Sequence, residues 1–159
     1  MRAKTSILFV CTGNICRSPA AEGVLRDALR RAGLQEQVRI ASAGTHGYHA
    51  GEPPDERAQR HAARRGYEIG GLRARAVARS DFEEFDLILA MDRGHLRILQ
   101  RLAPQAHRHK LRLFMEYAEG WSEQEVPDPY YGGPEGFEQM LDMIEAGARG
   151  LLAALRRPA

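Results

Sequence analysis

Short apolar segments alternate along this chain with longer segments in which apolar residues recur every three or four positions. Residues 6–10 and 86–91 are largely continuous apolar runs, and residues 38–42 and 110–114 alternate between apolar and polar. We interpret the four segments as β-strands, with the two continuous runs as central strands buried on both faces. The alternation of strands with helical segments predicts one α/β domain, spanning residues 1–159, around a mostly parallel sheet.

The helical segments have recognisable ends. The first is predicted to begin near Ser18, which suits an N-cap, and Pro19, which suits the first turn. Its apolar stripe ends at Gly33, a residue typical of helix C-termini. Three more helices are expected over residues 55–66, 94–103 and 136–156.

Composition narrows the class of protein. The chain has 159 residues, 43% of them hydrophobic and 28% charged, which is enough for one well-filled core. The formal net charge is only +2 and arginines are scattered, which disfavours nucleic-acid binding. No apolar run approaches the roughly 20 residues needed to span a bilayer, and the first apolar stretch is too short for a signal peptide. We therefore expect a soluble, cytoplasmic protein without a membrane partner.

The loop after the first strand reads CTGNICRSP over residues 11–19 and carries the clearest chemistry. In parallel α/β sheets, ligands bind beyond the carboxyl ends of the strands. A glycine-containing loop that opens onto a helix N-terminus presents backbone N–H groups and a positive dipole, which suit a phosphate-sized anion. The same field favours the thiolate form of Cys11, a nucleophile, and Arg17 could donate two parallel N–H groups to phosphate oxygens.

Other interpretations of this loop remain open at this point. No Gly-Lys-Ser or Gly-Lys-Thr sequence ends the loop, so ATP binding is disfavoured. Cys11 could be only a small buried residue at a strand end, with Arg17 a surface charge. The only other cysteine, Cys16, is too close for a stabilising disulfide, and two free thiols are typical of a reducing compartment.

A carboxylic acid near a leaving oxygen accelerates ester cleavage, and Asp128 is the candidate. It lies in the sequence PDPYYGG, which predicts a constrained loop outside regular structure. It could equally be a turn former beside Pro129, and the residues alone leave both interpretations open. Asp92, at the end of the third strand, is a rival for which we favour a structural hydrogen-bonding role.

The stretch VCTGNICRSPAAE, together with DPYYG near Asp128, resembles the low-molecular-weight protein tyrosine phosphatases. SAG at residues 42–44, DLILAMD ending at Asp92 and the overall length are also similar, so the resemblance covers nearly the whole chain. It implies a three-layer, flavodoxin-like α/β fold with a four-stranded parallel sheet of order 2-1-3-4, flanked by helices on both faces. It also implies catalysis without a metal or other cofactor, with Cys11 as nucleophile, Arg17 as phosphate ligand and Asp128 as general acid.

The resemblance assigns further residues around the loop. The phosphate-binding loop would comprise Thr12, Gly13, Asn14, Ile15, Cys16 and Ser18. Asn14 and Ser18 would hold its shape and steady the thiolate, and Ser42 would join their hydrogen-bond network. Vertebrate members carry a histidine where Leu72 stands here, so we expect the network to be completed differently.

Aromatic residues suggest the substrate. Tyr130 and Tyr131 follow the candidate acid, and Tyr48 lies in the loop after the second strand, so the three could wall a slot for a phenyl ring. A recessed Cys11 would be reached by phosphotyrosine and not by the shorter phosphoserine. Alternatively, one or more of these tyrosines, Tyr48 above all, simply packs on the surface.

The sequence thus predicts a protein tyrosine phosphatase that also hydrolyses small aryl phosphates through a phosphocysteine. The alternatives are a phosphoarginine phosphatase of the same fold, which usually has threonine where Ile15 stands, and a non-catalytic phosphate-binding module. Arsenate reductases of this fold need further cysteines, which this chain lacks.

The expected partner is a phosphotyrosine-containing protein, such as a tyrosine kinase. Inorganic phosphate or sulfate would compete for the same loop. We expect the chain itself to be a monomer or a weak dimer. Cys16 could form a reversible disulfide with oxidised Cys11, or could have a packing role alone. Residues 107–110 are interpreted as solvated charge and not as a metal site.

Overall fold

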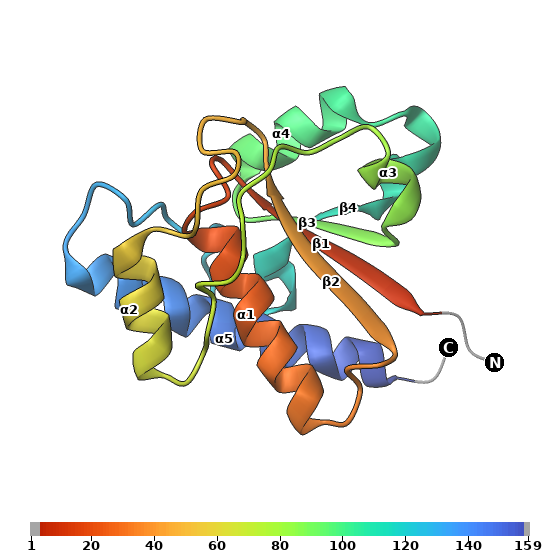
Figure 1. Cartoon of the computed structure of the whole chain (residues 1–159). Coiled ribbons are helices and arrows are strands. Elements are labelled where there is room, and N and C mark those ends of the chain that lie inside the picture. The colour runs from red at the N-terminus through yellow and green to blue at the C-terminus, as the bar shows by residue number, and fades with distance from the viewer. Residues whose placement is uncertain (1–3, 158–159) are drawn as a thin grey trace.

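A four-stranded parallel sheet forms the centre of the computed structural model, which describes residues 4–157 (Figure 1). The strands are β1 (Thr5–Cys11), β2 (Val38–Gly44), β3 (Leu87–Ala90) and β4 (Leu111–Leu113), in the order β2-β1-β3-β4. This confirms the expected order 2-1-3-4. The two apolar runs form the central strands β1 and β3, because only a strand covered on both faces buries apolar side chains at successive positions.

Helices cover both faces of the sheet, and alternate residues of β1 point to each of them. Ile7 and Phe9 belong to the core on one face, and Leu8 and Val10 to the core on the other. Figure 1 shows α1 (Arg17–Arg31), α2 (Glu56–Arg64) and α5 (Pro134–Arg156) on one side of the sheet, and α3 (Asp81–Glu84) and α4 (Arg93–Leu102) on the other. The expected three-layer α/β architecture is therefore confirmed.

The short elements differ from the prediction. Helix α3 and two 3₁₀ helices, η1 (Gln105–Lys110) and η2 (Phe114–Tyr117), were not expected, because segments of four to six residues carry no clear periodicity. The two 3₁₀ helices include Lys110 and Phe114, the first and last residues of the predicted strand 110–114, and leave a fourth strand of three residues. Lys110, interpreted as solvated charge, donates to the carbonyl of Phe82 at 2.7 Å. Among residues 4–157, no three His, Cys, Asp or Glu side chains are grouped to hold a metal ion.

The start of α1 corrects a second prediction. Cys16 is the N-cap residue and makes no side-chain capping bond, so the helix begins one residue before Ser18. Ser18 is fully buried in the first turn, with its hydroxyl 2.9 Å from the sulfur of Cys11. The serine that we expected to cap the helix is thus turned toward the end of β1.

The longest helix, α5, packs closely against η2. A Cβ atom at Gly150 would lie only 1.7 Å from the carbonyl oxygen of Tyr117, so this contact requires glycine. Within the part of the chain that the structure describes, neither α5 nor any other helix has the length and apolar character needed to cross a bilayer.

Candidate functional site

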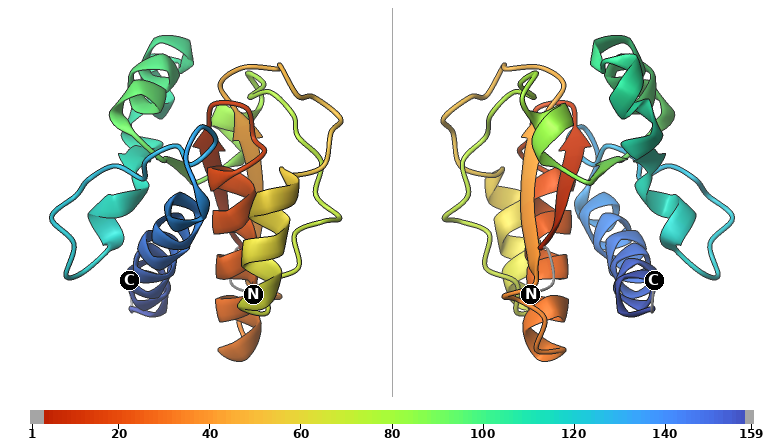
Figure 2. Two further views of the ribbon diagram at one scale, coloured as in Figure 1. Left: turned by 90° about the vertical axis from the view of Figure 1, so that its left-hand side faces the viewer. Right: turned by 90° about the vertical axis from the view of Figure 1, so that its right-hand side faces the viewer.

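Three chain segments meet at the carboxyl end of the sheet: the loops that follow β1 and β2, and the segment before α5 (Figure 2). They enclose a pocket of about 200 Å³. Its lining contains the candidate nucleophile, phosphate ligand, acid and aromatic residues, namely Cys11, Thr12, Gly13, Ile15, Cys16, Arg17, Tyr48, His49, Asp128, Tyr130 and Tyr131. Segments more than 100 residues apart in sequence therefore share one cavity.

The backbone of residues 11–17 is held from outside. The N–H groups of Thr45, His46 and Asp55 donate to the carbonyls of Cys11, Thr12 and Ile15, at 2.8, 3.0 and 2.9 Å. No acceptor among the described residues binds the N–H groups of residues 13–16. Because the carbonyls are bound from outside and the N–H groups are not, the loop is built to accept an anion.

Cys11 ends β1 with a free, buried thiol. The backbone N–H of Arg75 donates to Asn14 Oδ1 at 3.0 Å, which fixes the orientation of the amide. Its Nδ2 then donates to Ser18 at 2.8 Å and to Ser42 at 3.0 Å. Ser18 already accepts from Asn14, so its own hydroxyl hydrogen can be donated either to the sulfur of Cys11, 2.9 Å away, or to the carbonyl of Ala43, at 3.4 Å. A sulfur that becomes negatively charged is the stronger acceptor of the two. Asn14 holds a left-handed φ of 60° in this arrangement.

The network ends at Glu22, a residue that sequence reasoning missed. Ser42 Oγ donates to Glu22 Oε1 at 2.7 Å, and Arg26 donates to Oε2 at 2.6 Å. Glu22 is buried, whereas Leu72 only packs against the core. A signal was present in the sequence: Glu22 lies four residues after Ser18, on the same side of α1.

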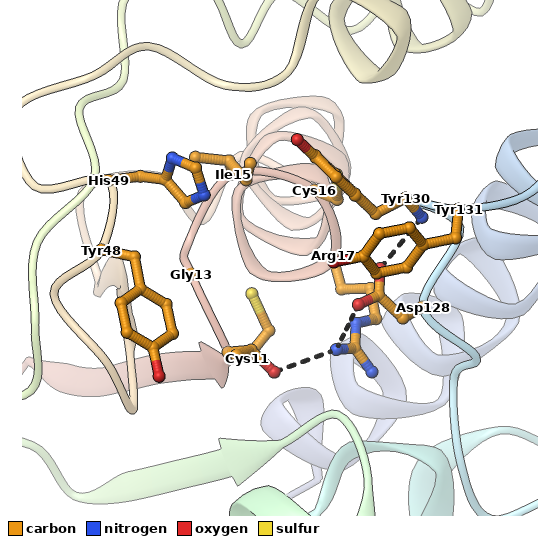
Figure 3. A pocket seen from close by; sticks show the side chains of 11 residues that line it. Cys11, Gly13, Ile15, Cys16, Arg17, Tyr48, His49, Asp128, Tyr130 and Tyr131 are labelled. Carbon is orange, nitrogen blue, oxygen red and sulfur yellow. Dashed lines mark hydrogen bonds and ion pairs between the residues drawn. The ribbon is translucent and has the colours of Figure 1, made fainter.

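Arg17 is buried and anchored from behind. Its Nη1 donates to Asp92 Oδ2 at 2.9 Å and to the carbonyl of Val126 at 3.0 Å. Its Nη2 lies 3.4 Å from Thr12 Oγ1 and 3.6 Å from Asp128 Oδ2 (Figure 3). One edge of the guanidinium is therefore anchored in the protein, and the other faces the pocket.

Asp92 has the structural position that we favoured for it. It is the N-cap of α4, where its Oδ1 accepts from the backbone N–H of His95 at 2.9 Å. Burial alone would raise the pKa of Asp92, but this hydrogen bond and the ion pair with Arg17 outweigh it and lower the pKa. Asp92 is therefore ionised and neutralises the buried guanidinium.

Asp128 lies on the opposite side of the pocket from Tyr48, and its side chain is 43% exposed (Figure 3). Its Oδ1 accepts from the backbone N–H of Tyr130 at 3.0 Å, and its Oδ2 faces Arg17. The structure thus brings Cys11, Arg17 and Asp128 together around one space.

The walls of the pocket are aromatic. Figure 3 shows Tyr48 and His49 on one side of Cys11, and Tyr130 and Tyr131 on the other. Tyr130 is 37% exposed, against 72% for Tyr48 and 91% for Tyr131. His49 was not predicted as a lining residue.

Arg57 supports one wall and was also missed. Its guanidinium lies 5.1 Å from the ring centroid of Tyr130, within cation–π range. The Arg57 guanidinium donates to the carboxylate of Asp55 at 3.0 Å. The backbone N–H of Asp55 in turn donates to the carbonyl of Ile15, in the loop that follows β1. Through these contacts the position of Tyr130 is connected to the loop.

Cys16 is buried in the core beside the pocket. Burial raises the pKa of its thiol, and the negative groups of Asp55, Cys11 and Asp128 raise it further. Cys16 is therefore a neutral thiol next to the candidate nucleophile.

Comparisons with known proteins agree with this geometry. The family model described as low molecular weight phosphotyrosine protein phosphatase matches residues 6–159. A low molecular weight protein-tyrosine-phosphatase of Streptomyces coelicolor is 49% identical over 153 residues, which cover 94% of this chain and 93% of that protein.

Solved structures are similar as well. A protein tyrosine phosphatase from Entamoeba histolytica, with Hepes in its active site, superposes with a TM-score of 0.93 at 38% identity, covering 96% of this chain and 97% of that one. Vibrio vulnificus Wzb in complex with benzylphosphonate superposes with a TM-score of 0.82 at 31% identity, covering 96% and 99%. The chain therefore belongs to the low molecular weight phosphotyrosine protein phosphatase family.

Proposed function

We propose that this protein hydrolyses phosphotyrosine in proteins, and small aryl phosphates, through a phosphocysteine on Cys11 with Asp128 as general acid and then general base. The observation that carries the proposal is the shared pocket: a buried thiol, a buried guanidinium and a half-exposed carboxyl group line a space of about 200 Å³ with aromatic walls.

In the first step the phosphoryl group occupies the loop, bound by the backbone N–H groups and the open edge of Arg17. The sulfur of Cys11 attacks phosphorus in line, an S–P bond forms, and the P–O bond to the phenol breaks. Asp128 gives its proton to the departing oxygen. Charge on the equatorial oxygens is stabilised by donors that are already oriented.

In the second step water attacks the phosphocysteine. Asp128, now a carboxylate, takes a proton from the water, and the S–P bond breaks to release inorganic phosphate. The sulfur leaves as a thiolate, and the hydroxyl of Ser18, 2.9 Å away, stabilises it by donating a hydrogen bond. The Asn14 network keeps that hydroxyl oriented throughout.

Two features of the pocket select the substrate: the depth at which Cys11 lies and the tyrosines that line the pocket. Cys11 is only 3% exposed, so a phosphate group must project far from the substrate backbone to reach it, as that of phosphotyrosine does. Tyr48 and Tyr130 provide flat apolar surfaces for the ring. The benzylphosphonate bound by the related Wzb carries a ring and a phosphonate in the same relation. The apolar Ile15 in the lining of the pocket further supports an aryl ester.

The proposed partner is a phosphotyrosine-containing protein, with phosphate and sulfate as competitors for the loop. A cytoplasmic location is part of the proposal, because the two free thiols Cys11 and Cys16 are suited to a reducing compartment.

A substrate panel tests the proposal. Purified protein is mixed with an aryl phosphate and with phosphotyrosine, phosphoserine and phosphoarginine peptides, and released phosphate is measured. We expect turnover of the first two and little of the others. Preference for the phosphoarginine peptide would replace the aryl assignment with the arginine phosphatase.

Rapid mixing with an aryl phosphate separates an enzyme from a phosphate-binding module. The proposal predicts phenol release by wild type, and none by Cys11→Ser, which retains the loop and should still bind phosphate. Appreciable turnover by Cys11→Ser would contradict the role of Cys11.

A further inference from the structure

His95 lies directly behind the phosphate loop and has no part in the mechanism above. It belongs to the first turn of α4 and is only 4% exposed. It is not among the residues that line the pocket, so we assign it no direct contact with the substrate. Its ring nevertheless reaches two residues that do line it, Thr12 and Arg17.

The contacts of the ring determine where its proton lies. Nε2 is 2.7 Å from Thr12 Oγ1 and 3.4 Å from Arg17 Nη2. A guanidinium can only donate, so Nε2 must be the unprotonated, accepting nitrogen. The hydroxyl of Thr12 then donates to Nε2, and its oxygen is left to face Arg17 Nη2.

The other ring nitrogen agrees with this tautomer. Nδ1 lies 3.1 Å from Asp92 Oδ1, although the alignment falls short of a full hydrogen bond. A proton on Nδ1 is attracted to the carboxylate, whereas a lone pair there would be repelled. Burial, together with the charge of Arg17, lowers the pKa of His95 to about 4, so the ring is neutral at physiological pH.

Arg17 is thus anchored at Nη1, while Nη2 faces the pocket with two longer protein contacts beside it. Asp92 and the carbonyl of Val126 bind Nη1, and Thr12 and His95 lie along Nη2. Without the His95 acceptor, the hydroxyl of Thr12 would be free to rotate. Thr12 Oγ1 and Asp128 Oδ2 would remain near Nη2, at 3.4 and 3.6 Å, but nothing would keep the Thr12 hydroxyl hydrogen turned away from the guanidinium.

We propose that His95 is a positioning residue, a neutral hydrogen-bond acceptor behind the phosphate loop that orients the hydroxyl of Thr12 and the pocket-facing edge of Arg17 for oxyanion binding. This inference rests on the proposed function for its catalytic consequence, but not for its effect on phosphate affinity. It predicts that the acceptor at the Nε2 position matters, and that filling the space does not suffice.

Two amide substitutions at His95 distinguish the role of Nε2 from that of Nδ1. The side-chain oxygen of His95→Gln can occupy the Nε2 position and accept from Thr12. The shorter His95→Asn can place polar atoms only near the Nδ1 position, beside Asp92. His107→Leu is the control, because His107 also has a buried Nδ1 without a partner but lies in η1, away from the pocket.

Phosphate affinity by calorimetry and the kcat and KM for an aryl phosphate are measured for each variant, with the melting temperature. We expect His95→Asn to weaken phosphate binding at least about fivefold and to lower kcat at least about tenfold. His95→Gln should remain within about threefold of wild type in both, and His107→Leu should be unchanged.

A double-mutant cycle with Thr12→Val tests the route of the effect. If His95 acts through Thr12, adding Thr12→Val to His95→Asn causes little further loss of phosphate affinity. Wild-type phosphate affinity in His95→Asn, equal losses in His95→Gln and His95→Asn, or strictly additive losses in the double variant would overturn the proposal. Because calorimetry needs no turnover, a wild-type protein that binds phosphate but hydrolyses no aryl ester would refute the proposed function and leave this test intact.

Discussion

Truncation of Glu22 is the most informative perturbation of the hydrogen-bond network beneath Cys11. Glu22→Ala removes the acceptor that Ser42 Oγ uses at 2.7 Å in a buried site. No second acceptor for that hydroxyl is present among its hydrogen-bond partners in the described chain. Arg26 also loses its partner, but its side chain is 48% exposed and water can replace the contact.

The size of the expected loss of stability follows from one buried hydrogen bond, that between Ser42 and Glu22. A hydrogen bond to a charged group contributes about 1.5–3 kcal/mol, and an orphaned buried hydroxyl costs a similar amount. For a chain of this length each kcal/mol shifts the melting temperature by about 2–4 °C, so Glu22→Ala should melt about 3–12 °C below wild type. If about 1 kcal/mol of the loss is felt at the sulfur through Asn14 and Ser18, kcat for an aryl phosphate falls about fivefold.

The assay compares Glu22→Ala with Glu22→Gln, which keeps an acceptor oxygen for Ser42, and with Glu36→Gln at an exposed position. Calorimetric melting and initial rates are measured on the same preparations. Glu22→Gln should lose less than half as much stability as Glu22→Ala, and Glu36→Gln almost none. A melting temperature for Glu22→Ala within about 1 °C of wild type would refute the account of the network.

Three further predictions concern the acid, the second cysteine and pH. Asp128→Asn should lower kcat by about 10²–10⁴-fold for a phenol that is a poor leaving group and far less for nitrophenol, and equal losses would exclude general acid catalysis. After peroxide and then reductant, Cys16→Ser should recover less activity than wild type if Cys16 traps oxidised Cys11 as a disulfide, and equal recovery would leave Cys16 only a packing role. Folding lowers the pKa of His95 from its usual value of about 6.5 to about 4. Between these two pH values the unfolded chain binds a proton at His95 that the folded chain does not. The free energy of unfolding should therefore fall by about 3 kcal/mol as the pH drops from about 6.5 to about 4. Denaturant titrations from pH 7 to pH 4 should show a smaller fall in the free energy of unfolding for His95→Gln than for wild type. The lowered pKa of Asp92 adds a further fall near pH 4 in both proteins.

The layered fold was predictable because its information is local. The apolar runs at residues 6–10 and 86–91 required strands buried on both faces, and these are the central strands. Segments as short as α3, with four residues, and η1, with six, lack the periodicity on which such predictions depend. Ser18 was misinterpreted for another reason: a serine at a helix start can cap it, but here a tertiary contact with Cys11 uses the hydroxyl.

The site was predictable where one short segment holds the chemistry, as it does from Cys11 to Ser18. Glu22, His95 and Arg57 were missed because their partners are distant in sequence: Glu22 binds Ser42, Arg57 contacts Tyr130, and His95 reaches Thr12. Contacts across 20 to 83 residues are set by how the helices pack on the sheet, which a single sequence does not report.

The identity of the phosphorylated residue tests the central proposal most directly. Wild-type protein and Asp128→Asn, in which the intermediate should persist longer, are mixed with an aryl phosphate and quenched in acid during turnover. The phosphoryl group is then located by mass spectrometry of the proteolytic peptides. We predict phosphate on Cys11, in an amount that accounts for the phenol released in the first turnover. Phosphate on any other residue, or turnover with no phosphorylated peptide at all, would contradict the phosphocysteine mechanism.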